Sequence, residues 1–170
     1  MTIFLETERL IIKNPTADDF AVIHELCTDK DVMQFIGDGS LSTPESTLSK
    51  LAKDIAHFSK HKFGLGLVYE KESGQFIGQA GLFHLEYNDN QPRIEIGYRL
   101  HKAYWNKGYA TELTKKLVEW GFQNLPTDRL NAVVDPRNLK SQEVVKKAGL
   151  EFIEETRFYN KQINLYEVKR

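Results

Sequence analysis

The chain has 170 residues, of which 41% are hydrophobic and 28% charged, and its formal net charge is -1 at pH 7. This length and composition are typical of one globular domain, so we expect a single domain over residues 1–170. A nearly neutral chain without a basic tract lacks the clustered Lys and Arg side chains that bind a phosphate backbone. The composition therefore argues against nucleic acid as a main partner.

The N-terminal segment and the cysteine content bear on location. The opening MTIFLETE has too short an apolar stretch and too early a charge for a signal peptide, and no run of apolar residues approaches membrane-spanning length. We therefore expect a cytoplasmic protein with no membrane partner. The one cysteine, Cys27, cannot form an internal disulfide, and we expect it to be a small core residue and not a catalytic thiol.

Hydrophobic periodicity predicts strands and helices in alternation along the chain. A strand is expected over 9–13, and Thr16 followed by Asp19 has the pattern of a helix N-terminus. The expected fold is α/β (α+β), with a mixed sheet of about seven strands and about four helices on its two faces. The remaining strands are expected at 63–70, 75–84 and 94–100 and near Arg129, Phe152 and Ile163, and the remaining helices at 43–60, 111–124 and 138–148.

Two helices carry specific expectations about side-chain packing. In the helix that begins at Thr43-Pro44, the expected buried stripe is Leu48, Leu51, Ala52 and Ile55. In the helix over 111–124, the expected inward residues are Leu113, Leu117 and Trp120, and Glu112 is expected to pair with Lys116.

Two of the histidines have a spacing found in metal sites. His57 and His61 lie one helical turn apart, which is the spacing of a two-histidine metal site, but no third ligand and no carboxylate stand in the same short motif. We therefore expect a solvated helix face and no metal site. His84 and His101 end strands near the presumed cleft, and a surface position is favoured for both.

The most informative segment is EIGYRLHKAYWNKGYATE, over residues 95–112, because it joins a half-buried strand to a helix through a turn. The first turn of a helix has N–H donors without partners and a partial positive charge, so it binds anions. Gly108 and Ala110 leave the backbone accessible to a phosphate, and Lys107 adds a positive charge. The segment predicts a pyrophosphate site, although Asn106-Lys107-Gly108 alone also fits an ordinary strand-to-helix turn.

A second segment places polar groups on an apolar helix face. Asn138, Ser141, Val145 and Ala148 recur at spacings of three and four residues, with Val144 beside them. Asn138 could simply cap the helix, and Ser141 could bond back to a backbone carbonyl. Two polar groups therefore share an otherwise apolar stripe.

These two segments resemble motifs of the GNAT superfamily of acyl-CoA-dependent N-acyltransferases, whose acetyl-CoA motif reads Gln/Arg-x-x-Gly-x-Gly/Ala. In WNKGYA, Trp105 replaces the leading Gln/Arg, and Asn106 replaces a common Gly while tolerating a left-handed backbone. An aromatic residue followed by Gly-Lys-Gly-Tyr-Ala-Thr-Glu is usual in the RimJ/RimL-type branch that acetylates ribosomal-protein N-termini. The opening ETERLIIKNPTADDF also resembles that branch.

The resemblance implies a single GNAT-like domain with a mixed, mostly antiparallel central sheet. It also implies acetyl-CoA as co-substrate and a set of residues that contact it. The backbone of the strand would pair with the pantetheine arm, and the turn would hold the pyrophosphate. The implied acetyl-CoA contacts are Tyr98, Arg99, Leu100, Trp105, Asn106, Lys107, Gly108, Tyr109, Ala110, Thr111, Asn138 and Ser141.

The resemblance also implies catalytic groups. Alternation places Glu95, Gly97 and Arg99 on one face of a strand; Glu95 could be a solvent-facing carboxylate paired with Arg99, whereas in the family a carboxylate on this strand is often the base. Gly97 suggests a bulge or a close backbone approach. Many family members protonate the leaving thiolate with a Tyr at the position of Val145, so the acid here would be Ser141, a water or none.

The acceptor is expected to be a primary amine. The branch resemblance favours the α-amine of a protein or peptide N-terminus, and a sparse catalytic set suits an α-amine of pKa about 7.8 better than a lysine of pKa about 10.4. Phe35, Tyr87 and Tyr159, together with Phe158, are candidate acceptor contacts. A small-molecule amine (polyamine, amino sugar or antibiotic) and a non-catalytic acyl-CoA-binding module are the alternatives, and a homodimer is possible.

Overall fold

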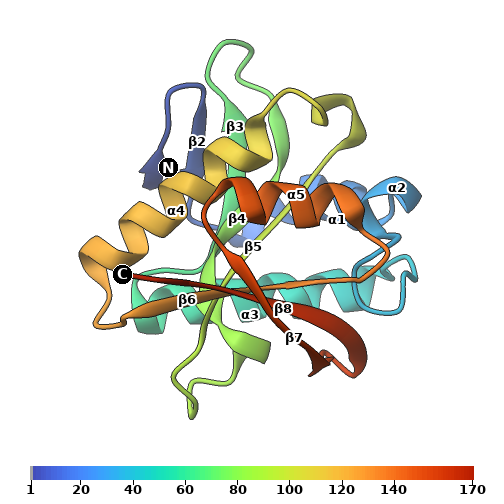
Figure 1. The fold of residues 1–170 in the computed structure, drawn as a ribbon. Helices are drawn as coiled ribbons and strands as arrows, with labels where there is room; N and C mark the ends of the chain where they lie inside the picture. Colours follow the sequence, from blue (N-terminus) through green and yellow to red (C-terminus); the bar gives the residue numbers. More distant parts are fainter. Residues whose placement is uncertain (1) are drawn as a thin grey trace.

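The structure is a computed structural model that describes residues 2–170 (Figure 1). No helix in this range is long and apolar enough to cross a bilayer. In chain order the elements are β1 (Ile3–Glu6), β2 (Leu10–Lys13), η1 (Ala17–Asp19), α1 (Phe20–Cys27), α2 (Lys30–Met33), α3 (Pro44–His61), β3 (Leu65–Glu70), β4 (Phe76–His84), η2 (Leu85–Tyr87), β5 (Ile94–Leu100), η3 (Lys102–Tyr104), α4 (Tyr109–Asn124), β6 (Arg129–Val134), α5 (Leu139–Lys147), β7 (Glu151–Phe158) and β8 (Lys161–Lys169).

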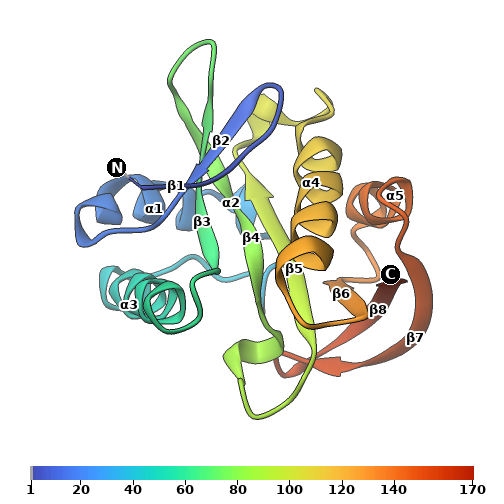
Figure 2. The same cartoon turned by 90° about the vertical axis from the view of Figure 1, so that its left-hand side faces the viewer.

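The strands form one eight-stranded sheet in the order β1-β2-β3-β4-β5-β6-β8-β7. All neighbours are antiparallel except β5 and β6, which run parallel and are paired only at Glu95 and Asn131. Figure 2 shows α1 and α3 on one face of the sheet and α4 and α5 on the other. The expected mixed α/β architecture is confirmed, and the middle of the sheet opens where β5 and β6 part.

The core is divided between the two faces of the sheet. Apolar residues of β2, β4 and β5 pack against Leu113 and Leu117 of α4, which are fully buried as expected. On the other face, Cys27 lies in the cluster beneath α1 and α3 and is also fully buried, in agreement with its expected role. The two layers of helices therefore fix the positions of β4 and β5 from both sides.

The strand count was one too low because β1 was not predicted. Only four residues form it, at the edge of the sheet, and only Leu5 among them is buried. A short edge strand with one inward side chain gives too weak a period-two signal to be recognised. The other strands and the helices α3, α4 and α5 lie where the sequence predicted them.

The predicted buried stripe of α3 is wrong for Leu48 and Ala52, whereas Leu51 is buried and Ile55 is partly buried against the same cluster. Leu48 is 54% exposed, and Ala52 is exposed as well. The residues that face inward are Thr47, Leu51, Asp54, His57 and Phe58. Polar residues occupy much of this face because partners satisfy them, and a search for apolar periodicity therefore misses them.

The predicted Glu112–Lys116 ion pair is also wrong. Lys116 pairs with Glu119 instead, at 2.9 Å. Glu112 points away from its own helix toward β1 and β2, where Arg9 Nε donates to it at 2.7 Å. Trp120 is partly buried, and its ring packs edge-on against Phe4 of β1.

Candidate active site

The turn before α4 has the backbone conformation that the sequence predicted. Asn106 and Gly108 both have left-handed φ angles, +60° and +79°, and Gly108 is the N-cap of α4. A Cβ atom at Gly108 would meet nothing closer than Arg9 Nη2 at 3.4 Å, so the space above the turn is open. The exposed helix N-terminus and the accessible backbone fit the pyrophosphate of acetyl-CoA.

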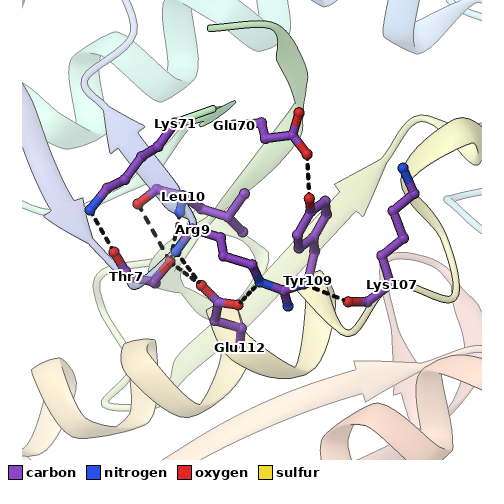
Figure 3. Close-up of polar contacts among 8 residues, drawn as sticks. All are labelled: Thr7, Arg9, Leu10, Glu70, Lys71, Lys107, Tyr109 and Glu112. Carbon is purple, nitrogen blue, oxygen red and sulfur yellow. Dashed lines mark hydrogen bonds and ion pairs between the residues drawn. The ribbon is translucent and has the colours of Figure 1, made fainter. Parts of the chain in front are cut away.

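Arg9, near the start of the chain, contacts this turn and the first residues of α4 (Figure 3). Its Nη1 atom donates to the Lys107 carbonyl at 2.9 Å, its Nε atom donates to Glu112, and its guanidinium lies 4.3 Å from the centre of the Tyr109 ring. No local pattern indicates this role, because Arg9 lies 98 residues before Lys107. The contacts fix the turn in place without using its N–H groups.

The predicted turn contacts do not all face the open side of the turn. The Tyr109 side chain is buried, and its hydroxyl donates to Glu70, so only the backbone of Tyr109 faces the turn. Lys107 Nζ lies 5.2 Å from the centre of the Tyr104 ring. Ala110 and Thr111 are half-buried in the first turn of α4.

Strand β5 has an unpaired edge beyond Glu95, because β6 leaves it there. Tyr98, Arg99 and Leu100 lie along this edge, as the added-strand prediction requires. The Leu100 carbonyl already accepts a bond from Trp105 Nε1 at 2.8 Å, and the Arg99 guanidinium is held by Gln79 Oε1 of β4. The pantetheine arm would therefore pair mainly with the backbone before Leu100.

Gly97 marks a close approach and not a bulge. The β4–β5 pairing is continuous from Gly78–Leu100 to His84–Ile94. A Cβ atom at Gly97 would lie 2.9 Å from the ring of Phe83 on β4. Glycine is needed at this position so that Phe83 can pack over β5.

A pair of hydroxyl groups joins β5 to α5. Tyr98 Oη and Ser141 Oγ are 2.8 Å apart, and burial raises the pKa of Tyr98 to about 12, so the phenol keeps its proton at neutral pH. Asn138 caps α5 by accepting from the Ser141 N–H at 3.2 Å, and Val145 is buried one turn further on. The sequence predicted a backbone role for Tyr98 but not this side-chain contact.

A cavity of about 460 Å³ lies where β5 and β6 diverge. Its wall includes Phe35, Tyr87 and Tyr159, three of the four residues predicted to contact the acceptor. Phe158 is not among the lining residues, and its ring packs against Arg93 instead. Residues of α3, of the segment before α3 and of the turn between β7 and β8 complete the wall.

Glu95 is buried in this cavity, with 6% of its surface exposed. The Tyr159 hydroxyl donates a hydrogen bond to Glu95, whereas no Glu95–Arg99 ion pair forms within residues 2–170. The alternative of a solvent-facing Glu95 paired with Arg99 is therefore wrong. Burial raises the pKa of Glu95 to about 8, although the bond from Tyr159 opposes this shift. A carboxylate with this pKa is suited to exchange a proton near neutral pH.

Asp54 is a second buried carboxylate of the cavity that sequence reasoning missed. It is 3% exposed, and Oδ1 accepts from the Tyr87 hydroxyl at 2.5 Å. Burial raises the pKa of Asp54 to about 6. A signal was present, because Asp54 lies three residues after Leu51 and four before Phe58, on one helix face with both.

Asp135 and Lys161 hold the acceptor side of the cavity together. Lys161 Nζ is 2.8 Å from Asp135 Oδ2 and also donates to the Phe35 carbonyl at 3.1 Å. Arg137 pairs with the same carboxylate, and these cations hold the pKa of Asp135 well below its usual range. The contacts connect the end of β6 to the segment before α3 and to the start of β8.

His57 does not lie on a solvated helix face, so that expectation was wrong. Only 7% of its surface is exposed, and its Nδ1 atom is 2.8 Å from the Phe63 carbonyl. His84, expected at the surface, is half-buried with Nδ1 3.0 Å from His57 Nε2. Burial lowers the pKa of His57 to about 4, so the ring is neutral at physiological pH. His101 lies apart from them, near Asp29.

Comparisons with known proteins agree with this geometry. A family model described as an acetyltransferase (GNAT) domain matches residues 9–151. The uncharacterized N-acetyltransferase YoaA of Bacillus subtilis is 28% identical over 147 residues, which cover 86% of this chain and 82% of YoaA. An acetyltransferase from Agrobacterium tumefaciens has a crystal structure with a TM-score of 0.84 at 25% identity, covering 100% of this chain and 95% of that one.

Two more distant structures share the fold. RimL, a ribosomal L7/L12 alpha-N-protein acetyltransferase in complex with coenzyme A, matches with a TM-score of 0.81 at 13% identity, over 98% of this chain and 97% of RimL. AAC(6')-Ib in complex with ribostamycin and coenzyme A matches with a TM-score of 0.79 at 17% identity, over 96% and 94%. The family match spans Glu95, Ser141 and the turn at 105–110 before α4, which we call the phosphate turn after its proposed ligand. The chain therefore belongs to the GNAT acetyltransferase family and is an acetyl-CoA-dependent N-acetyltransferase.

Proposed function

We propose that this N-acetyltransferase modifies the α-amine of a protein or peptide N-terminus. The observation that carries the proposal is the position of Glu95, a buried carboxylate in the cavity wall whose pKa is raised to about 8. Glu95 acts as the base that receives the proton of the amine, directly or through a water. Tyr159 holds this carboxylate in one orientation.

The pKa values favour an α-amine over a lysine side chain. An α-ammonium group has a pKa of about 7.8, so transfer of its proton to a base of pKa about 8 is nearly balanced. A lysine ammonium has a pKa of about 10.4, and the same transfer would be uphill by about 3 kcal/mol. The raised pKa of Glu95 is therefore close to the pKa of an α-ammonium group and far below that of a lysine.

The donor would lie between β5 and α5. Acetyl-CoA supplies the acetyl group as an activated thioester. The N-terminus of α4 at Gly108, with Lys107 beside it, would hold the pyrophosphate, and the unpaired edge of β5 would bind the pantetheine arm. Ser141 Oγ, hydrogen-bonded to Tyr98, would donate a proton to the leaving sulfur. A thiol of pKa about 8.5 needs only modest help to leave.

A small-molecule amine is the second candidate, because other carboxylates line the cavity beside Glu95. The wall carries both signs of charge, with Asp38, Asp54, Glu86 and Asp135 set among Lys50, Lys53, Arg99 and Lys161. Several carboxylates around one cavity would suit a compact molecule with more than one ammonium group, such as a polyamine or an aminoglycoside. Formation of a homodimer is a separate prediction, which concerns assembly and not the acceptor.

The test is thiol release from acetyl-CoA with a panel of acceptors. Peptides that begin with Ala or Ser are compared with spermidine, with aminoglycosides and with the same peptides carrying a blocked N-terminus and an internal Lys. We expect release only with the free N-termini. Release with polyamines or aminoglycosides and none with peptides would overturn the proposal in favour of a small-molecule acceptor.

A further inference from the structure

We propose that His57, His61 and His84 form a binding site for a divalent transition-metal ion of the class that imidazole prefers, such as Zn²⁺. Two of these residues lie one turn apart at the end of α3, and the third ends β4. Each can offer one ring nitrogen such that these atoms lie within 4.8 Å of one another. This site is separate from the phosphate turn and from the acyl-transfer groups Glu95 and Ser141.

The three rings form a compact cluster. Their centroids are 4.6 Å apart for His57 and His61, 4.5 Å for His61 and His84, and 5.2 Å for His57 and His84. His57 Nε2 and His84 Nδ1 are 3.0 Å apart, and two nitrogens at this separation, each about 2.1 Å from an ion, subtend about 90°. His61, at the accessible end of α3, brings a third ring nitrogen within 4.8 Å of the other two.

Acceptors outside the cluster orient two of the rings. The Phe63 carbonyl lies 2.8 Å from His57 Nδ1 and requires the proton there, which leaves the lone pair of Nε2 for the cluster. Asp89 Oδ2 lies 3.1 Å from His61 Nε2 and leaves the lone pair on His61 Nδ1. Metal-binding histidines almost always donate their other N–H to a carbonyl or a carboxylate in this way.

Hydrogen bonding alone explains this arrangement less completely. Without an ion, His57 Nε2 accepts from His84, through Nδ1 at 3.0 Å or the backbone N–H at 3.3 Å. The bond to Asp89 orients His61, but no hydrogen bond links its ring to the two rings that it contacts. A cation shared by all three imidazoles accounts for the convergence, and the Asp89 carboxylate would offset part of its charge.

The site would connect to the acceptor end of the cavity through Tyr87. The His57 ring packs edge-on against Tyr87 with centroids 5.8 Å apart, and Tyr87 in turn donates to Asp54 and stacks on Phe83. An ion that ties the end of α3 to the end of β4 would fix the position of Tyr87 in the cavity wall. It would be a structural ion and would not touch the reacting groups.

The test is calorimetric titration of the untagged full-length protein with Zn²⁺, because a polyhistidine tag would bind the ion itself. We expect one Zn²⁺ per chain, with a dissociation constant in the micromolar range or below, and a higher melting temperature in its presence. His61→Gln and His84→Gln should each weaken Zn²⁺ binding about tenfold or more. His101→Gln, which removes a histidine outside the cluster, should leave the affinity unchanged.

A second measurement uses only the wild-type protein, so its outcome does not depend on whether the histidine variants fold. Long-range ¹⁵N correlation spectra of the wild-type imidazoles should show shifts of His57, His61 and His84 on addition of one equivalent of Zn²⁺, with His24 and His101 unaffected. Absence of Zn²⁺ binding to the wild-type protein would overturn the proposal. Equal binding by wild type, His61→Gln and His84→Gln, or imidazole shifts confined to other histidines, would overturn it as well.

Discussion

The hydroxyl of Tyr159 donates a hydrogen bond to the carboxylate of Glu95, and the two residues are 64 positions apart in the chain. Tyr159 lies in the turn between β7 and β8 with a left-handed φ of +54°, and its backbone N–H donates to Glu86 at 2.9 Å. This bond connects the β7–β8 turn to η2, directly after β4. The protonation of Glu95, the proposed base, therefore depends on the position of the β7–β8 turn, which also lines the acceptor cavity.

Replacing the proposed base tests whether it takes part in the reaction. Glu95→Gln keeps the size of the side chain and an acceptor for the Tyr159 hydroxyl but cannot take a proton. We expect kcat for amine acetylation to fall about tenfold or more, with acetyl-CoA affinity near normal, because Glu95 lies outside the phosphate turn. Steady-state kinetics and calorimetry measure the two quantities.

Glu155→Gln is the matched control for this change, because Glu155 is an exposed carboxylate on β7. It should leave both the rate and the affinity unchanged. A wild-type rate in Glu95→Gln would remove Glu95 from the mechanism.

The hydrogen bond from Tyr159 should be visible in the pH dependence of the rate. The bond stabilises the charged form of Glu95 and so opposes the effect of burial, which still raises the pKa to about 8. Tyr159→Phe removes the bond, and the pKa of Glu95 should rise further. The acid limb of the kcat/KM profile, which reports the base in the free enzyme, should therefore move to higher pH, and activity at pH 7 should fall.

Tyr87→Phe provides the comparison for that profile. Tyr87 also lines the cavity, but its hydroxyl donates to Asp54 and not to Glu95. The acid limb assigned to Glu95 should stay in place in this variant. A limb that does not move in Tyr159→Phe, or moves to lower pH, would show that Glu95 is not the titrating base.

The phosphate turn can be tested with a pair of glycine variants. Gly108→Ala introduces a side chain at a φ of +79°, beside the proposed pyrophosphate position, and Gly74→Ala does so at +71° in the hairpin turn between β3 and β4. Both variants should lose similar stability, about 1–2 kcal/mol, from the left-handed backbone. Only Gly108→Ala should also weaken acetyl-CoA binding, because only there would a Cβ atom face the phosphates.

Thermal unfolding and calorimetry with acetyl-CoA separate the two effects. Equal acetyl-CoA affinity in Gly108→Ala and in wild type would contradict the assignment of the turn. Weakened binding in both variants would point to a general loss of structure and not to a local block.

The order of elements could be predicted from the sequence because local patterns encode it. The alternation of Ile94 to Leu100, the proline at the start of α3 and the glycine at the start of α4 each act within a few residues. The same local rules placed Glu95 on one strand face and Ser141 on one helix face. These predictions needed no knowledge of which segments pack together.

The contacts between distant segments could not be predicted in this way. Arg9 reaches the phosphate turn, and Asp54 meets Tyr87, only after the sheet and helices have packed. The histidine cluster shows the same limit, since His84 is 27 residues from His57 and became its neighbour through the pairing of β3 with β4. A buried polar residue satisfied by a distant partner reads locally as a surface residue.

The hydroxyl pair of Ser141 and Tyr98 allows a test of the leaving-group step. Ser141→Ala removes the hydroxyl that would donate to the departing sulfur, and we expect kcat to fall about tenfold with little change in KM for the acceptor. Tyr98→Phe should have a smaller effect, because the phenol acts only through Ser141. Ser49→Ala, an exposed position of α3, is the matched serine control. An unchanged kcat in Ser141→Ala would mean that a thiol of pKa about 8.5 leaves unaided, and that Ser141 serves only to bond α5 to β5.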